Sequence, residues 1–240
     1  MPLPKIDVPT YEIELPLSKK KIKFRPFLVK EQRNLLMAME SNDTDTVHNS
    51  IKDILNNCTL TENIIIDKLP IVDIEYYFIN LRAKSVSEVV ETKYKCNNEV
   101  EDKLCGNIMD VEINLLDINV EGIKENEDVQ LTEKIFVKMR YPQFYIVKDS
   151  VDMESMTEIT FNIIAESIEY VFDGDQYHYA SEAQQGEMLE FVESLNQIQF
   201  EKLEKFFNEL PKLKKNIEIK CSKCGFDHSI EVEGLESFFA

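Results

Sequence analysis

Cys221 and Cys224 carry the sharpest chemical signal in the sequence. They form a C-x-x-C pair that Gly225 follows at once, and a short strand is expected on each side of the pair. Two thiolates at this spacing can hold one tetrahedral Zn²⁺ from a tight turn, which the glycine allows to close. The pair therefore predicts half of a metal site of the zinc-ribbon kind.

Cys96 and Cys105 are the candidates for the other half. They also lie between two expected strands, and Gly106 follows Cys105, but the eight residues 97–104 separate the two cysteines. We interpret this charged stretch as an insert that lengthens the usual turn. The hypothesis is that the two hairpins meet around one Zn²⁺ held by four cysteines. Four protein ligands leave no open coordination position, so the metal would be structural.

Other interpretations of these cysteines stay open. Cys96 and Cys105 could be ordinary buried thiols without a metal, and His228 could replace one thiolate, although such a histidine is more often a solvated strand residue. A redox C-x-x-C is typical of a βαβ setting, whereas this pair is expected between strands. The fifth cysteine, Cys58, ends a helical stripe and is predicted to be a core side chain.

The elements that must position the cysteines predict an α+β fold. It consists of an N-terminal β-hairpin, a helical middle, and two Cys-bearing β-hairpins that form a zinc-ribbon-like element. Apolar alternation predicts the first hairpin over 11–17 and 22–27. Helical spacing predicts helices over 29–39, from Asn42 or Thr44 to Leu55, and over 70–81. Further strands are expected over 86–95, 108–115, 131–139, 217–220 and 229–232, with 118–128 as a connector.

The section from 142 to 211 is expected to be helical, because capping patterns precede apolar residues at helical spacing. The first predicted helix starts at Ser155, where Glu158 completes a capping box, and ends after Phe172 at Gly174. The second starts at Ser181, with Gln184 completing its capping box. The third starts near Asn196 and ends before Pro211.

These elements divide the chain into four predicted regions. Residues 1–84 hold the N-terminal hairpin and helices, 85–140 the first Cys-bearing β region, and 141–211 the helical region. Residues 212–240 hold the C-x-x-C hairpin and an aromatic tail, and we expect them to pack with 85–117.

The charge of the chain argues against several classes of function. Asp and Glu number 45 against 27 Lys and Arg, a net charge of -18 over 240 residues, which repels nucleic-acid phosphates and anionic membranes. No run approaches the roughly 20 apolar residues of a membrane span. Residues 1–10 lack the apolar stretch of a signal peptide. We therefore expect a cytosolic protein with no nucleic-acid and no membrane partner.

Catalytic motifs are missing from the sequence. It holds no glycine-rich phosphate loop, no H-E-x-x-H and no G-x-S-x-G, and its many carboxylates are expected on solvated helix faces. We predict that the chain is not an enzyme and has no small-molecule substrate. The terminal Phe238 and Phe239 are a predicted partner-binding pair, which either fills a partner's groove or packs back on the chain's own ribbon.

Two stretches resemble the baseplate hub proteins of T-even-type (T4-like) myoviruses. One combines an aromatic helix, a C-x-x-C-G turn and a closing Gly-Leu-x-x-Phe-Phe: FEKLEKFFNELPKLKKNIEIKCSKCGFDHSIEVEGLESFF. The other is a strand-turn-strand that leads into a helix: LPKIDVPTYEIELPLSKKKIKFRPFLVKEQRNLLMAME. The resemblance covers most of the chain and carries no catalytic residues.

This resemblance implies a phage tail baseplate hub assembly protein, either a structural subunit or an assembly chaperone. Its partners would be other baseplate hub and tail proteins. Its location would be the host cytoplasm during assembly and, for a permanent subunit, the tail baseplate of the virion.

Two rival functions stay open. A zinc-ribbon adaptor in a nucleic-acid process would need a basic surface, and residues 19–25 form the one strong basic run. Filter binding at low salt would detect that function. A thiol oxidoreductase would use Cys221 and Cys224, and a disulfide-reduction assay with Cys221→Ser as the control would decide it.

Overall fold

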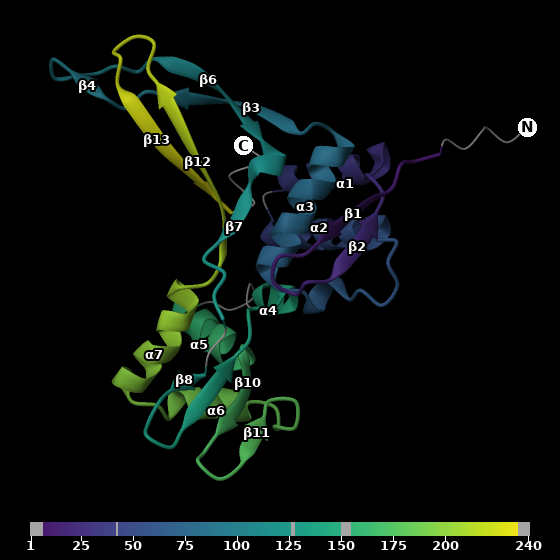
Figure 1. Ribbon diagram of the computed structural model, residues 1–240, viewed down its shortest axis with the longest axis vertical. Helices are drawn as coiled ribbons and strands as arrows, with labels where there is room; N and C mark the ends of the chain where they lie inside the picture. The colour runs from purple at the N-terminus through teal and green to yellow at the C-terminus, as the bar shows by residue number, and fades with distance from the viewer. Residues whose placement is uncertain (1–6, 42, 126–127, 150–154, 235–240) are drawn as a thin grey trace, which may run out of the picture.

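The protein has an α+β fold with three parts. The computed structural model describes residues 7–41, 43–125, 128–149 and 155–234. Figure 1 shows a helical body that carries the N-terminal hairpin, two long β-hairpins that extend away from it, and a distal lobe with helices and a small sheet. Three clusters of buried apolar side chains correspond to these parts.

The helical body confirms the predicted N-terminal hairpin and helices. Ile22 and Phe24 of the second strand are buried with residues of all three helices. Asp73, fully buried in the first turn of α3, accepts hydrogen bonds from the backbone N–H groups of Leu17 and Ser18 at 2.8 and 2.9 Å. This carboxylate attaches the hairpin turn to the helices. The elements are β1 (Tyr11–Glu14), β2 (Lys21–Phe24), α1 (Val29–Glu40), α2 (Thr44–Cys58), the 3₁₀ helix η1 (Ile66–Lys68) and α3 (Ile71–Ser85).

The two long hairpins, which we call the ribbon arm, carry the predicted cysteines. They are β3 (Val89–Lys95) with β6 (Ile108–Asn114), and β12 (Lys212–Lys220) with β13 (Asp227–Glu233). Both hairpins are antiparallel. Apolar side chains from both hairpins, among them Ile113, Leu213 and Val232, pack together with Ile79 and Ala83 of α3. Segments 85–117 and 212–233 therefore share one apolar cluster at the base of the arm.

The prediction of a plain connector over 118–128 was wrong. Residues 119–121 form the strand β7 (Asn119–Glu121), which follows the 3₁₀ helix η2 (Leu115–Asp117) and pairs with β12. Val120 is opposite Leu213 in this ladder. A strand with one apolar residue has almost no periodic signal, so its partner strand decides its conformation.

The distal lobe packs helices against a four-stranded antiparallel sheet of order β11-β10-β9-β8. Val137, Met139 and Ile168 of the sheet are buried with Ile164 and Leu203 of the helices. The sheet strands are β8 (Val129–Gln130), β9 (Phe136–Met139), β10 (Ile168–Phe172) and β11 (Tyr177–Tyr179). The helices of the lobe are α5 (Met156–Glu166), α6 (Glu187–Glu193) and α7 (Gln197–Asn208), while Phe144 of the preceding helix α4 (Phe144–Asp149) packs in the core of the helical body.

The helix predicted from Ser155 to Phe172 was wrong in its second half. Ser155 does cap the helix, by accepting a hydrogen bond from Thr157 N–H, but α5 ends at Glu166 and β10 follows. The run from Ile168 to Phe172 consists of β-branched and aromatic residues with one Glu, and such a run suits either structure. Because this segment pairs with β9, it forms a strand. Gly174 is in the β10–β11 turn with a φ of +99°, and not at a helix end.

The capping box predicted at Ser181 and Gln184 was also wrong. Helix α6 begins at Glu187, after Gly186, whose φ is +88°. The side chain of Glu187 reaches back and accepts a hydrogen bond from Gln184 N–H at 2.8 Å. The helix near Asn196 is confirmed, since this residue caps α7 by accepting from Gln199 N–H.

Candidate metal centre

The four predicted cysteines meet where the two hairpins of the ribbon arm turn. Their sulfur atoms all lie within 4.8 Å of one another. The shortest contacts cross between the hairpins: Cys96 Sγ lies 3.7 Å from Cys224 Sγ, and Cys105 Sγ lies 3.8 Å from Cys221 Sγ. Residues more than a hundred positions apart in the sequence thus form one compact set of donors.

The sulfur geometry fits a tetrahedral metal site. With zinc–sulfur bonds of about 2.3 Å, two sulfurs at the corners of a tetrahedron lie about 3.8 Å apart. The crossed distances of 3.7 and 3.8 Å agree with that edge. A disulfide would need about 2.05 Å, and all the cysteines are free thiols.

The C-terminal turn positions its pair through the backbone. Cys221 N–H donates to the carbonyl of Phe226 at 2.8 Å, and Gly225 N–H donates to the carbonyl of Cys221 at 2.9 Å. The φ of Gly225 is +72°, a left-handed conformation that a glycine adopts without steric cost. The turn between β12 and β13 therefore points both thiols of Cys221 and Cys224 to the same side.

The first turn repeats this hydrogen-bond pattern in spite of its length. Cys96 N–H donates to the carbonyl of Asn107 at 2.8 Å, and Gly106 N–H donates to the carbonyl of Cys96 at 3.1 Å. The φ of Gly106 is +63°. The two turns are thus equivalent around their cysteines and glycines, and the insert does not disturb the first one.

The insert folds outward as a hairpin of its own. It consists of β4 (Glu99–Val100) and β5 (Lys103–Leu104), joined by Glu101 and Asp102 at positive φ, as in a two-residue hairpin turn. Cys105 N–H donates to the carbonyl of Asn98 at 2.8 Å and closes the base of this hairpin. Without residues 99–104 the sequence reads C-N-N-C-G, which is an ordinary C-x-x-C-G turn.

Two asparagines beside the sulfurs escaped the sequence reasoning. Asn98 Nδ2 lies 3.7 Å from Cys224 Sγ, and Asn107 Nδ2 lies 3.6 Å from Cys221 Sγ. Each amide comes from the first hairpin and donates to a sulfur of the second. Asn98 lies two residues after Cys96, and Asn107 directly follows the pair of Cys105 and Gly106; these positions are the signal that could have identified them.

His228 is buried against the cluster, so the expectation of a solvated strand residue was wrong. Its side chain is 6% exposed and packs between the rings of Tyr94 and Phe226. His228 Nε2 lies 3.2 Å from Cys96 Sγ. The imidazole therefore contacts a donor sulfur from behind, as a hydrogen-bond partner, while the set of four sulfurs is complete without it.

The electrostatics of the thiols are uneven. Hydrogen bonds from the backbone amides of Cys224 and Lys223 lower the pKa of Cys221 to about 6. Burial raises the pKa of Cys96 to about 12. Several thiolates at this spacing would repel one another, and a bound cation removes that repulsion because it favours the charged form of each ligand. The donor set therefore fits a metal that prefers sulfur.

The other predicted residues fall in different places. Cys58 belongs to the core of the helical body, as predicted, and burial raises the pKa of its thiol to about 11. Phe238 and Phe239 lie outside the described residues. Across the described ranges, no helix combines the length and the apolar character that crossing a membrane requires.

Comparisons with known proteins agree with the resemblance seen in the sequence. The profile of the family described as T4 bacteriophage base plate protein matches residues 8–240. The baseplate hub assembly protein gp26 of Enterobacteria phage T4 is 25% identical over 242 residues, which covers 95% of this chain and 97% of that protein. No solved structure matches the chain. The chain belongs to the T4 bacteriophage base plate protein family.

Proposed function

We propose that this chain is a phage tail baseplate hub assembly protein that acts by binding other proteins and has no catalytic role. Its similarity to the hub assembly protein of phage T4 extends over nearly the full length of both chains. The proposed partners are other baseplate hub and tail proteins, met in the host cytoplasm during assembly. A small-molecule substrate and a nucleic acid have no part in the proposal.

We further propose that Cys96, Cys105, Cys221 and Cys224 bind one structural Zn²⁺. The crossed sulfur contacts of 3.7 and 3.8 Å carry this proposal, because they match the edges of a zinc–thiolate tetrahedron. Four thiolates fill the coordination sphere, so the ion would supply charge and bonds but no reactive position.

The place of the site in the ribbon arm explains what the metal would do. The apolar cluster of the arm lies at its base, against α3. Near the cysteines, the side chains of Leu104, Ile108 and Phe226 are largely exposed, between 46% and 66%. Apolar packing near the cysteines consists of partly buried side chains such as Tyr94 and Ile219, so the binding energy of the metal would add to the folding energy of the joint.

The neighbouring polar groups would orient the ligands. Asn98 and Asn107 would donate to sulfurs of the opposite hairpin, and the buried imidazole of His228 would contact Cys96. Such partners of the ligands fix the ligand geometry and tune the affinity for the metal.

Elemental analysis of the purified protein tests the zinc proposal. We expect one zinc per chain in the parent and in Cys58→Ala, which removes a cysteine of the helical core, and loss of zinc in Cys105→Ser. A parent protein that binds no zinc, or an undiminished zinc content in Cys105→Ser, would contradict the shared site.

We also propose that the terminal Phe238 and Phe239 bind a partner. A tagged chain expressed during infection should capture identified hub and tail proteins, and Phe238→Ala with Phe239→Ala should reduce that capture. Leu36→Ala with Met37→Ala, two exposed apolar residues of α1 away from the cysteines, is the matched control. Equal capture by all three proteins would contradict a partner-binding role for the terminal pair.

The same infection distinguishes a subunit from a chaperone. Presence of the chain in purified mature particles would identify a structural subunit. Its absence from particles, together with loss of hub assembly when the gene is deleted, would identify an assembly chaperone.

A further inference from the structure

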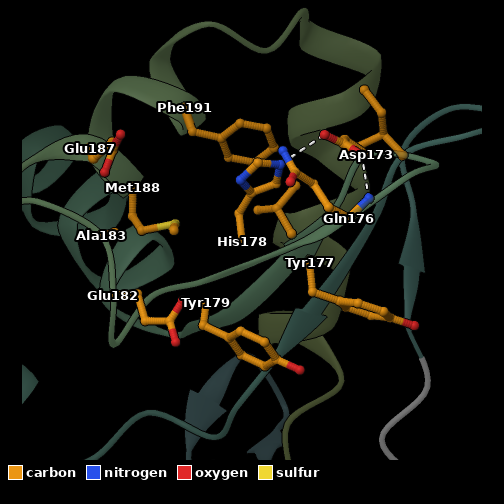
Figure 2. A pocket seen from close by; sticks show the side chains of 12 residues that line it. Asp173, Gln176, Tyr177, His178, Tyr179, Glu182, Ala183, Glu187, Met188 and Phe191 are labelled. Atoms are coloured by element: carbon orange, nitrogen blue, oxygen red, sulfur yellow. Dashed lines mark hydrogen bonds and ion pairs between the residues drawn. The ribbon is translucent and has the colours of Figure 1, made fainter.

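The distal lobe has a half-open hollow between the edge strand β11 and helix α6, of about 550 Å³. We call it the β11 groove. Apolar side chains of β10, α6 and the segment before β9 contribute to its lining: Ile135, Val171, Met188 and Phe191. Figure 2 shows His178, Met188 and Phe191 on one side of the β11 backbone, while Tyr177 and Tyr179 point away on the other side.

The lining of the β11 groove also includes acidic side chains. Asp173, Glu182 and Glu187 are among its residues. Asp173 accepts hydrogen bonds from His178 Nε2 at 2.8 Å and from Gln176 N–H at 2.9 Å. These bonds lower the pKa of Asp173 to about 2, with His178 the largest cause. At neutral pH the groove therefore presents an apolar surface with negative charge beside it.

Strand β11 is the last strand of its sheet, and part of its backbone points away from β10. The N–H groups of Asp173 and Ala180 donate to the carbonyls of Gln176 and Glu169 across the ladder. Hydrogen-bonded and non-hydrogen-bonded pairs alternate in an antiparallel ladder, so the pair of Phe172 and Tyr177 is non-hydrogen-bonded. The N–H and C=O of Tyr177 consequently point outward, in the direction from which another strand could pair.

The charge around the β11 groove is one-sided far beyond its lining. The segment from Ser155 to Glu193 contains nine Asp and Glu and no Lys or Arg. It includes α5, β10, β11 and α6 and so forms much of the distal lobe. Half of the net charge of -18 thus belongs to about a sixth of the chain. A cationic ligand is attracted to such a surface, and an anionic one is repelled.

We infer that the β11 groove binds an extended, basic segment of another protein, which adds as a strand to β11. Main-chain hydrogen bonds to Tyr177 would hold the segment, and alternate side chains would face opposite sides of the sheet. Apolar side chains on one side would enter the groove. On the other side, lysines or arginines would meet the exposed rings of Tyr177 and Tyr179, which are 53% and 43% exposed and favour cations.

A second copy of this chain is a poor occupant of the same groove. Pairing β11 with itself would bring two segments of strongly negative charge together without an intervening cation. Like charges that meet across an interface oppose association. The inference rests on the proposed function only in taking the ligand to be a protein, and it names a binding surface that the proposed function leaves unspecified.

A labelled peptide tests the inference directly. The probe is Lys-Val-Lys-Ile-Lys-Val-Lys with a fluorescent label, titrated with the full chain while anisotropy is measured. The matched control peptide has proline in place of the central isoleucine, so that it keeps the charge but loses a main-chain donor. We expect the first peptide to bind at least tenfold more tightly than the control.

Three variants assign the binding to the β11 groove. Tyr177→Pro removes the outward N–H and leaves the donors that pair with β10, and Glu182→Lys reverses a charge in the groove lining. Each should weaken peptide binding at least tenfold. Glu201→Lys makes the same charge change on α7, which packs near β8 at the opposite edge of the sheet, and should leave binding nearly unchanged. Circular dichroism would verify that Tyr177→Pro is folded, and Glu182→Lys, an exposed surface change, does not depend on that control.

The outcomes separate the alternatives. Equal binding of the two peptides, or equal effects of Glu182→Lys and Glu201→Lys, would show unspecific charge attraction and overturn the inference. So would a dimer of the chain that Tyr177→Pro dissociates. None of these results bears on the zinc content of the ribbon arm, so failure here is distinguishable from failure of the proposed function.

Discussion

Deleting residues 99–104 should leave metal binding intact. The deletion turns the first cysteine turn into C-N-N-C-G and matches it to the C-S-K-C-G turn of the second hairpin. The structure supports this change, since the Cys105 N–H already lies 2.8 Å from the Asn98 carbonyl at the base of the inserted hairpin. The hydrogen bonds of Cys96 and Gly106 do not involve the deleted residues.

The expected cost of the deletion is small because the insert buries little. Its apolar side chains are Val100 and Leu104, which are 46% and 66% exposed. The burial that they lose corresponds to about 1–2 kcal/mol together. Structural zinc sites contribute about 10–16 kcal/mol, so one lost thiolate in Cys105→Ser should cost roughly a quarter of that, or about 3 kcal/mol.

Competition with a zinc chelator would compare the three proteins. The deletion variant should keep one zinc per chain with an affinity within about tenfold of the parent, which corresponds to 1.4 kcal/mol. Cys105→Ser should lose at least about a hundredfold by the same arithmetic. If the deletion variant lost its zinc as completely as Cys105→Ser, the equivalence of the two turns would be refuted.

Three further predictions concern single side chains. Asp73→Asn should destabilise the protein by about 2–4 kcal/mol, because it removes the charge from an acceptor of two backbone N–H groups. Urea unfolding would measure the loss of stability. A loss below about 1 kcal/mol would contradict the role of Asp73 as the attachment of the hairpin. Burial alone would raise the pKa of Glu31, but hydrogen bonds from Arg25 and Leu28 outweigh it and hold that pKa below its usual value. The stability that this carboxylate contributes is therefore present above the ordinary pKa of Glu and lost as the pH falls through the lower folded-state pKa. The midpoints of thermal unfolding of Glu31→Gln and of the parent should therefore differ at neutral pH and converge in acid. A difference that persists in acid would oppose this reasoning. His228→Ala should weaken zinc binding by about tenfold to a hundredfold, because it removes a hydrogen-bond partner of the Cys96 ligand. Competition with a chelator would measure the change in affinity. An unchanged affinity would show that the imidazole only packs against its neighbours and does not support the ligand.

Local patterns in the sequence predicted the helical body well. Alternation identified the hairpin of β1 and β2, and helical spacing identified α1, α2 and α3 within a few residues of their ends. These signals depend on residues that are neighbours along the chain, so they can be read without knowledge of the fold. The same holds for α7, whose cap Asn196 is directly before it.

The distal lobe shows where local patterns are ambiguous. The residues from Ile168 to Phe172 continue the apolar spacing of α5, yet they form a strand because β9 is available to pair with them. The strand β7 has a single apolar residue, Val120, and exists because β12 is beside it. In both segments the partner strand supplies the hydrogen bonds that decide the conformation, and the segment's own sequence does not contain that information.

By itself the sequence determined that the chain has two Cys-Gly turns between strands, because a turn of this kind needs only its own cysteines and glycine. Only the tertiary structure decided that the turns face each other with their sulfurs crossed and that His228 is buried against Cys96. It also decided that β11 is an edge strand beside an acidic groove. The physical reason is that such contacts join residues 116 or more positions apart or depend on which strand ends a sheet. Packing of the hairpins on α3 sets the long-range contacts of the cysteines, and packing of the sheet on its helices sets which strand lies at its edge.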